Sequence, residues 1–222
     1  MTGEGIEGAR PTDGPEQLKR SIDSLQRLYT IVVGLAVTEA LRVFLIAQTP
    51  PLQPWFANWR SLVVLLVTIV PFYHGANAHL DQSYLYGFAG KRREKRYALL
   101  LDFCVLFLEG VLFFALAVSL NDFSLSVRIF QAILLIDVLW ALFVFFTGDS
   151  SKDAKHALKW GALNVAAFAA VSGVLDSAQL VEAARPNWVL GIALLRTVVD
   201  YGICWDFYMA RPYPMLTSAE NA

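Results

Sequence analysis

The sequence has little charge and little cysteine. Only 17% of its 222 residues are Asp, Glu, Lys or Arg, whereas hydrophobic residues reach 56%. Soluble domains carry about 25% charged and about 45–50% apolar residues. This balance excludes intrinsic disorder and a nucleic-acid-binding surface as the main theme. Two cysteines are too few for a disulfide scaffold, so the composition indicates an integral membrane protein.

Motifs of soluble catalysis are also missing. The sequence contains no phosphate-binding loop, nucleophile elbow or catalytic metal motif. Its three histidines are poorly spaced for the three or four converging ligands of a zinc site. We therefore predict no metal and no cofactor. The sequence leaves open whether the chain is an enzyme, and the missing motifs argue against it.

Long apolar runs dominate the chain. A helix needs about 20 mostly apolar residues to cross a bilayer, and helices are expected because an unpaired backbone group is costly in lipid. Six runs meet this requirement, at 28–48, 60–79, 97–120, 126–147, 159–176 and 188–209. The predicted fold is an all-α, polytopic bundle of six transmembrane helices within residues 28–209.

The distribution of basic residues predicts the orientation. Most of the 18 Lys and Arg residues lie before the first run, between the second and third, between the fourth and fifth, or after the sixth. The positive-inside rule places these segments and both termini in the cytoplasm. The expected location is a cell membrane, specifically an inner membrane. One dense basic group also suits anionic lipid: Lys91, Arg92, Arg93, Lys95 and Arg96.

The flanking segments differ in character. Residues 1–14 are rich in Gly, Pro and acids, which predicts a disordered tail. Residues 15–27 place apolar side chains at helical intervals, which favours either an amphipathic interfacial helix or a simple extension of the first span. Residues 210–222 form the predicted cytoplasmic tail.

Small residues recur every four positions in the fifth run, at Ala162, Ala166 and Ala170. Such a stripe lets two helix backbones approach closely in a membrane. It predicts either packing inside the bundle or contact between two copies of the chain, as in a homo-oligomer.

Ionisable residues inside the predicted spans are the strongest functional signal, because such residues are costly in lipid and usually face the bundle interior. Several lie near the middle of their spans, which predicts a polar cluster near the membrane midplane. Its members are Glu39, Arg42, Glu109, Asp137, Arg196 and Asp200.

The acids of this cluster outnumber its arginines, so full ionisation would leave uncompensated buried negative charge. Protonation, a bound cation or a water-filled cavity would relieve that charge. The composition suits proton relay or binding of a cation or small polar solute. The alternative is structural, since polar pairs between helices also fix packing and register.

A second polar group lies at the inner ends of two spans. His74, Asn77 and Asp81 share one helical face of the second span and its continuation, and Asp102 lies near the start of the third. These residues are predicted to line an inner vestibule.

Three functional hypotheses follow. The first is a small transporter or channel for protons, cations or a small polar solute that uses the midplane cluster. The second is a membrane-embedded enzyme that modifies a lipid or isoprenoid near the vestibule, although no clear nucleophile is evident there. The third is a non-catalytic membrane sensor, assembly factor or effector.

Overall fold

The computed structural model describes residues 13–46, 59–86, 96–147 and 151–209. Every regular element within these ranges is helical, which confirms the all-α prediction. The long helices are α1 (Asp13–Ile46), α2 (Trp59–Leu80), α3 (Arg96–Val118), α4 (Phe123–Thr147), α5 (Ser151–Asp176) and α6 (Arg185–Ile203). Shorter pieces are the π-helical turn η1 (Asp81–Tyr86), the 3₁₀ turn η2 (Glu182–Ala184) and α7 (Trp205–Tyr208).

Five helical stretches are long and apolar enough to cross a membrane, which indicates a membrane protein. They are Glu16–Leu45, Trp59–Tyr84, Tyr97–Val118, Phe123–Phe146 and Lys155–Asp176. The helix α6 is not among them. It has 19 residues and carries Arg196 and Asp200.

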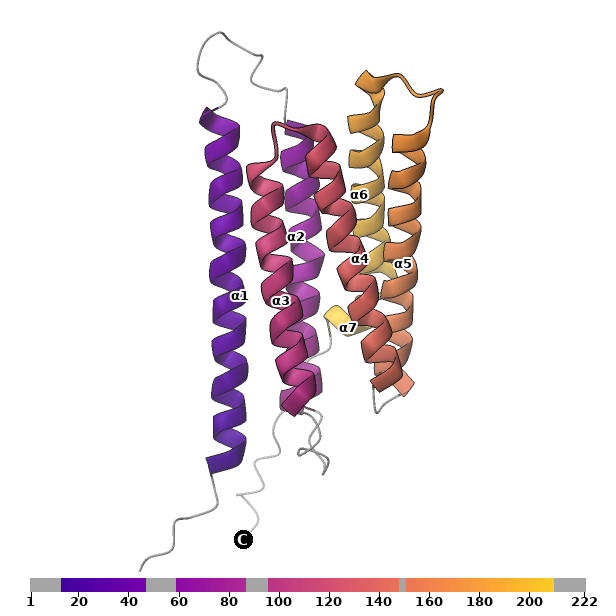
Figure 1. The fold of residues 1–222 in the computed structure, drawn as a ribbon. Coiled ribbons are helices and arrows are strands. Elements are labelled where there is room, and N and C mark those ends of the chain that lie inside the picture. Colours follow the sequence, from indigo (N-terminus) through magenta and orange to yellow (C-terminus); the bar gives the residue numbers. More distant parts are fainter. Residues whose placement is uncertain (1–12, 47–58, 87–95, 148–150, 210–222) are drawn as a thin grey trace, which may run out of the picture.

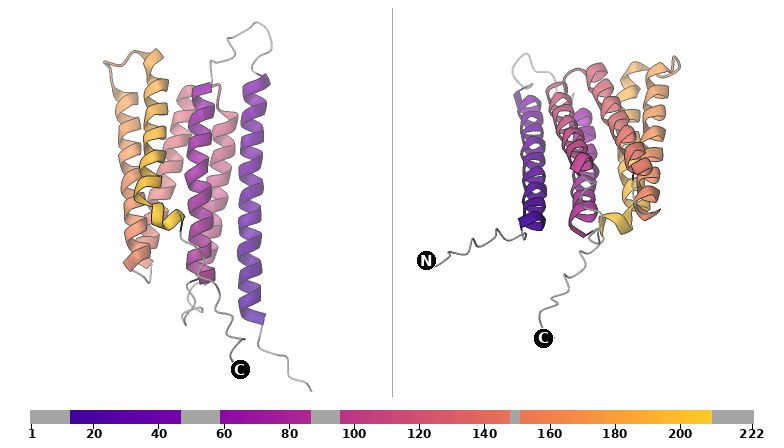
Figure 2. Two further views of the ribbon diagram at one scale, coloured as in Figure 1. Left: turned by 180° about the vertical axis from the view of Figure 1, so that it is seen from behind. Right: turned by 60° about the horizontal axis from the view of Figure 1, so that its bottom comes forward.

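The long helices lie side by side and run along a common direction (Figure 1). Helix α1 packs against α3 and α2, α3 packs against α4, α4 against α5, α5 against α6, and α6 against α2. Contacts between α2 and α3 cross the middle of this arrangement. The views from behind and from the tilted end show α7 turned across the lower part of the bundle, where it contacts α2 and α6 (Figure 2).

Helix α1 is continuous over residues that the sequence divides between two segments. Its buried side chains recur every three or four residues, which is the spacing of one helical face: Ile22, Leu25, Tyr29, Val33, Ala36 and Ala40. The opposite face exposes apolar side chains such as Ile31 and Leu35. Residues 15–27 and the first predicted span therefore form one helix with one buried stripe.

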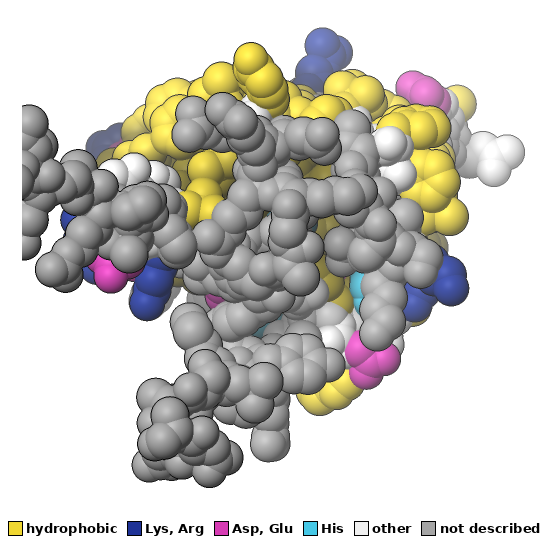
Figure 3. Space-filling view, turned by 90° about the horizontal axis from the view of Figure 1, so that it is seen from below, with side chains coloured by type: hydrophobic (Ala, Val, Ile, Leu, Met, Phe, Trp, Pro, Cys, Tyr) yellow, Lys and Arg dark blue, Asp and Glu magenta, His cyan; other side chains and the backbone are white. Residues whose placement is uncertain are grey.

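The outer surface of the bundle is strongly apolar. Seen from the end at which α1 begins, hydrophobic side chains cover much of the visible rim, with Lys and Arg side chains at its edge (Figure 3). Exposed side chains include Leu100 and Phe107 on α3, and Leu139 and Phe146 on α4. Exposed apolar patches of this extent are uncommon on soluble proteins and mark surfaces that contact lipid or another protein.

Glycine permits close helix packing at two positions. A side chain at Gly75 of α2 would overlap the ring of Trp160 from α5. A side chain at Gly110 of α3 would meet Val32 of α1 at 2.6 Å, well inside normal contact. These glycines therefore set how closely α5 and α1 approach the centre of the bundle.

The sixth predicted span, 188–209, is divided in the structure. Helix α6 ends at Ile203, and Cys204 adopts φ −111° and ψ 17°, outside the helical region. The chain then turns into α7, whose Tyr208 is buried. This turn brings the Tyr208 hydroxyl to Asp200 of α6.

Some sequence predictions fall outside the described residues. These include the tail over residues 1–12, the basic residues Lys91, Arg92, Arg93 and Lys95, and the tail 210–222. Asp13 and Gly14 belong to the start of α1, and Arg96 is the first residue of α3.

Candidate functional site

Two groups of hydrogen-bonded and ion-paired polar side chains lie in the buried interior of the bundle, and an electrostatic interaction between Glu109 and Asp137 connects them. Together we call them the buried polar network, which comprises Tyr29, Glu109, Asp137, Asn164, Arg196, Asp200 and Tyr208. Each of these side chains belongs to a residue that is at most 6% exposed. The network draws on α1, α3, α4, α5, α6 and α7, so it forms only when these helices are packed together.

Asn164 of α5 is the central member of the network. Its amide nitrogen donates a hydrogen bond to Asp137 Oδ2 of α4, and its amide oxygen accepts one from Arg196 Nε of α6 at 2.9 Å. Asn164 is fully buried. An amide side chain is suited to this position because it carries both a donor and an acceptor.

At one end of the network, Asp200 accepts two contacts through Oδ2. Arg196 Nη1 lies 3.3 Å away, one helical turn earlier on α6, and the Tyr208 hydroxyl donates from 3.0 Å. The Arg196 guanidinium also lies over the ring of Phe72, 4.6 Å from its centre. Among the described residues, neither Nη1 nor Nη2 of Arg196 has a hydrogen-bond partner, so the contact of Nη1 with Asp200 is an ion pair only.

At the other end, the Tyr29 hydroxyl of α1 donates to Glu109 Oε2 of α3 at 3.4 Å. Glu109 and Asp137 are close enough to interact electrostatically. The network therefore holds three carboxyl groups and one guanidinium. If every carboxyl were ionised, two negative charges would lack a compensating cation within the network, at a high cost in low dielectric.

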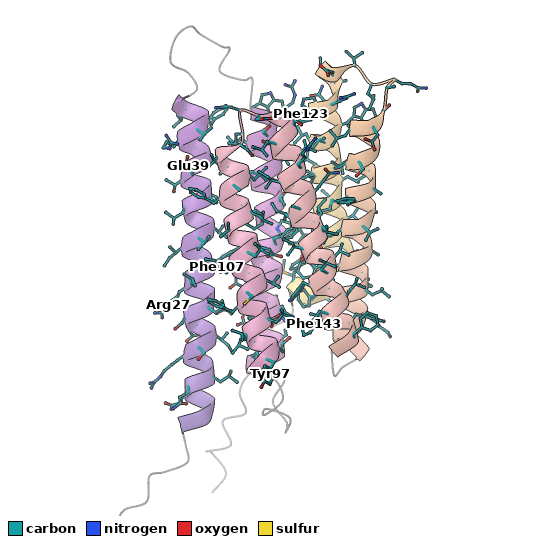
Figure 4. All side chains as sticks on the ribbon, in the orientation of Figure 1. Arg27, Glu39, Tyr97, Phe107, Phe123 and Phe143 are labelled. Atoms are coloured by element: carbon teal, nitrogen blue, oxygen red, sulfur yellow. The ribbon has the colours of Figure 1, made fainter. Side chains whose placement is uncertain are left out.

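Two members of the predicted midplane cluster lie elsewhere. Glu39 and Arg42 form their own ion pair on α1, with Arg42 Nη2 2.5 Å from Glu39 Oε1. The side chain of Arg42 is 55% exposed, and Figure 4 places Glu39 in the upper part of α1 at the edge of the bundle. The structure therefore brings Glu109, Asp137, Arg196 and Asp200 into one network and leaves the Glu39–Arg42 pair outside it.

The residues of the predicted vestibule each contact a different neighbour. His74 Nδ1 lies 3.2 Å from the Tyr201 hydroxyl, and its ring packs against Tyr208. The Asn77 amide donates to the carbonyl of Tyr73 in its own helix. Asp81 accepts a bond from Gln26 Nε2 of α1 at 2.9 Å. His74, Asn77 and Asp81 therefore do not converge on Asp102.

Asp102 instead has its own set of partners near the junction of α2 and η1. Tyr84 donates its hydroxyl to Oδ2 at 2.7 Å, and Trp140 Nε1 donates to Oδ1 at 2.8 Å. His79 Nε2 lies 3.3 Å from Oδ2. We call Asp102, His79, Tyr84 and Trp140 the Asp102 cluster. It is buried and spans α2, η1, α3 and α4.

The open space around these sites is limited. A groove of about 390 Å³ lies between α1, α2 and α6, and its walls include Val33, Ile69, Tyr73, His74 and Tyr201. A cavity of about 20 Å³ lies beside the Asp102 cluster. Within the described ranges, no three His, Cys, Asp or Glu side chains are grouped to hold a metal ion.

Sequence reasoning missed several partners in the network. Tyr29 and Tyr208 contribute hydroxyls, yet they look like ordinary aromatic residues in apolar segments. Asn164 lies among small apolar residues of α5, a setting in which a buried amide is noticeable in the sequence. The stripe Ala162, Ala166 and Ala170 lies on an exposed face of α5, away from Asn164.

Comparison with family models, with curated proteins and with solved structures finds no match for this chain.

Proposed function

We propose that this membrane protein is a small transporter or channel in which the buried polar network binds and passes protons. The observation that carries the proposal is the placement of Glu109, Asp137 and Asp200 in one buried network with a single guanidinium, that of Arg196. Buried carboxyl groups in excess over cations are the usual components of proton relays in membranes.

Two features favour protons over larger cations or solutes. The guanidinium of Arg196 carries a fixed positive charge beside Asp200, which disfavours a metal cation at that position. A proton also needs no wide passage, because it can move between hydrogen-bonded groups and bound water.

The proposed topology keeps six spans, with both termini in the cytoplasm of a cell inner membrane. Helix α6 supplies the sixth span, since it lies alongside the five more apolar helices and packs against α2 and α5. Its two charged residues, Arg196 and Asp200, are buried in the bundle rather than facing lipid. The charge content of α6 is therefore compatible with a membrane position.

The decisive experiment is proton flux in liposomes. The purified full chain is reconstituted with a pH-sensitive dye inside, and a potassium gradient with valinomycin sets the voltage. We expect Asp137→Asn to lower the flux by about 100-fold, the low end of what a positioned proton-transfer group contributes. Glu182→Gln is the matched control, because Glu182 is an exposed acid in η2 outside the network.

The measured flux distinguishes a proton-conducting network from a structural one. Flux that disappears in Asp137→Asn and persists in Glu182→Gln supports the proposal. Wild-type liposomes that match empty liposomes would contradict it, and so would full flux through the Asp137→Asn variant. In either of those cases the network is a packing device of the bundle.

Two interactions predicted from the sequence remain part of the proposal. Anionic lipid is expected at the basic segment Lys91–Arg96, and a second copy of the chain is expected where α5 exposes its alanine stripe. Native mass spectrometry from lipid nanodiscs measures both: retained anionic lipid should be lost when Arg92 and Arg93 become Gln, and a dimer should be lost in Ala166→Leu.

A further inference from the structure

One serine near the Asp102 cluster has a partner that the proton network does not use. Ser83 Oγ lies 3.3 Å from His79 Nδ1, and His79 Nε2 lies 3.3 Å from Asp102 Oδ2. A hydroxyl, an imidazole and a carboxylate are thus connected in series. We propose that Ser83, His79 and Asp102 form a nucleophilic site that cleaves carboxylic esters.

The orientation of the three groups fits that chemistry. Nε2 of His79 faces Asp102 Oδ2, and Nδ1 of the same ring faces the Ser83 hydroxyl, so Nδ1 is the nitrogen that would accept the Ser83 proton. A nucleophile within reach of a base, with the base oriented by a third group, is the arrangement by which serine is activated on unrelated folds. Both contacts are slightly longer than about 3.2 Å, as is common in the absence of substrate.

Asp102 is held firmly in its orienting role. Its side chain is 4% exposed, and Tyr84 and Trp140 donate to its two oxygens at 2.7 and 2.8 Å. These bonds stabilise the ionised carboxylate and fix its position. His79 is held as well, since its ring packs edge-on against Trp140 with the ring centres 4.7 Å apart.

A small cavity reaches the reacting atoms. Ser83, His79 and Gln82 line the cavity of about 20 Å³, together with Trp140, Trp160 and Phe207. Its volume suits one water-sized group, because a water needs at least about 10–15 Å³ of such space. The space matches the hydrolytic water or the oxygen of the reacting carbonyl, and a whole ester would need neighbouring side chains to move aside.

Gln82 is the group available to stabilise developing negative charge. Its Nε2 donates to the Phe207 carbonyl at 2.9 Å, and an amide nitrogen carries a second hydrogen. Gln82 also lines the cavity that Ser83 and His79 line. A donor aimed at the carbonyl oxygen lowers the barrier to formation of a tetrahedral intermediate.

Hydrolysis of an ester at this site needs only Ser83, His79 and water, with no cofactor. Ser83 Oγ attacks the ester carbonyl carbon while its proton moves to His79 Nδ1. The carbon–oxygen bond to the alcohol then breaks, and His79 gives that proton to the departing alcohol. Water attacks the acyl-serine, His79 takes its proton, and the carboxylic acid leaves as Ser83 regains a proton.

The site occupies residues outside the buried polar network, so it is tested independently of proton flux. The purified full chain in detergent is treated with an alkyl fluorophosphonate, which phosphonylates activated serines. Peptide mass spectrometry then maps the adduct. We expect an adduct on Ser83 that disappears in Ser83→Ala and falls by about 100-fold in His79→Gln, as for loss of a general base. Ser24→Ala is the control, because its hydroxyl bonds only locally, to the Arg20 carbonyl.

A second variant keeps the test informative where His79→Gln reduces folding. Ser83→Cys retains a nucleophile at this position, and the His79 ring should accelerate its alkylation by iodoacetamide about tenfold over the Ser83→Cys/His79→Asn double variant. Phosphonylation of Ser83 that depends on His79 supports the proposal. Absence of the Ser83 adduct, or labelling that is equal with and without His79, overturns it.

Discussion

Arg196 donates a hydrogen bond from Nε to the amide oxygen of Asn164 at 2.9 Å, and both residues are at most 2% exposed. Through this bond a charged residue of α6 reaches Asp137 on α4, because Asn164 donates in turn to that carboxyl group. Three helices that follow one another in the chain are thereby joined by side chains deep in the bundle.

Replacing Asn164 should destabilise the protein. Asn164→Leu leaves Asp137 Oδ2 and Arg196 Nε without their partner, and each stranded buried group costs about 1–3 kcal/mol. We expect a clear fall in the apparent Tm in detergent. Asn77→Leu is the control, since the Asn77 amide donates within its own helix, and its effect should be smaller. Equal falls in Tm for Asn164→Leu and Asn77→Leu would show that the contacts of Asn164 with Asp137 and Arg196 add no stability of their own.

Tyr208→Phe should weaken the attachment of α7 while keeping its aromatic packing. The substitution deletes the hydroxyl that donates to Asp200 at 3.0 Å, and the ring contacts with His74 and Tyr201 remain. The expected loss is about 1–3 kcal/mol, because Asp200 loses a buried donor. Proteolysis after Ile203 should become faster than in the wild type. An unchanged cleavage rate would show that ring packing alone holds α7.

Gly75→Ala should disturb the contact between α2 and α5. The added methyl group overlaps the Trp160 ring, and overpacking of this kind costs about 1–3 kcal/mol. Gly173→Ala on α5 is the matched control, because no atom lies within 4 Å of a side chain there. That change should be neutral or stabilising by up to about 1 kcal/mol through helix propensity. Thermal unfolding followed by tryptophan fluorescence compares the two.

Glu39→Gln should leave proton flux unchanged. The Glu39–Arg42 pair lies outside the buried polar network, and the Arg42 side chain is more than half exposed. The pair is formed within one helix, so it does not connect Glu39 to the carboxyl groups of the network. The liposome assay should therefore separate Glu39→Gln from Asp137→Asn. A comparable loss of flux in both variants would place α1 on the proton path.

Cysteine accessibility tests the number of spans. Single cysteines introduced as Gly3→Cys, Glu182→Cys and Ser218→Cys are treated with a membrane-impermeant maleimide in intact cells, after Cys104 and Cys204 are replaced by Ala. Six spans predict labelling at position 182 and protection at positions 3 and 218 until the cells are opened. Five spans would put positions 3 and 218 on opposite sides.

The helices follow from hydropathy alone, and their described ends lie close to the predicted ones for α2, α3 and α4. The break after Ile203 could not be predicted in the same way, because the segment 188–209 stays apolar enough to continue as a helix. The break accompanies a contact between Tyr208 and Asp200, and such contacts depend on packing rather than on local composition.

The sequence predicts how deep each charged residue of the candidate site lies along its helix. It does not predict which neighbouring helix the side chain faces. Position along a helix places Glu39 and Glu109 at similar depths, yet only rotation about the helix axis decides which neighbour each faces. Glu109 faces Tyr29, whereas Glu39 bonds to its own helix neighbour Arg42. Likewise, Ser83 and His79 are recognised as a candidate nucleophilic site only when the fold is known, because α3 brings Asp102 to the other side of the imidazole.

The turn at Cys204 bears on how fast water can reach the Asp200 carboxyl group. Asp200 accepts a hydrogen bond from the Tyr208 hydroxyl, and Tyr208 belongs to a helix of only four residues. We expect α7 to detach more readily than the long helices, because so short a helix has little structure of its own. Local opening of this kind takes place in microseconds to seconds. We expect water to reach the Asp200 carboxyl group on that timescale, when α7 detaches.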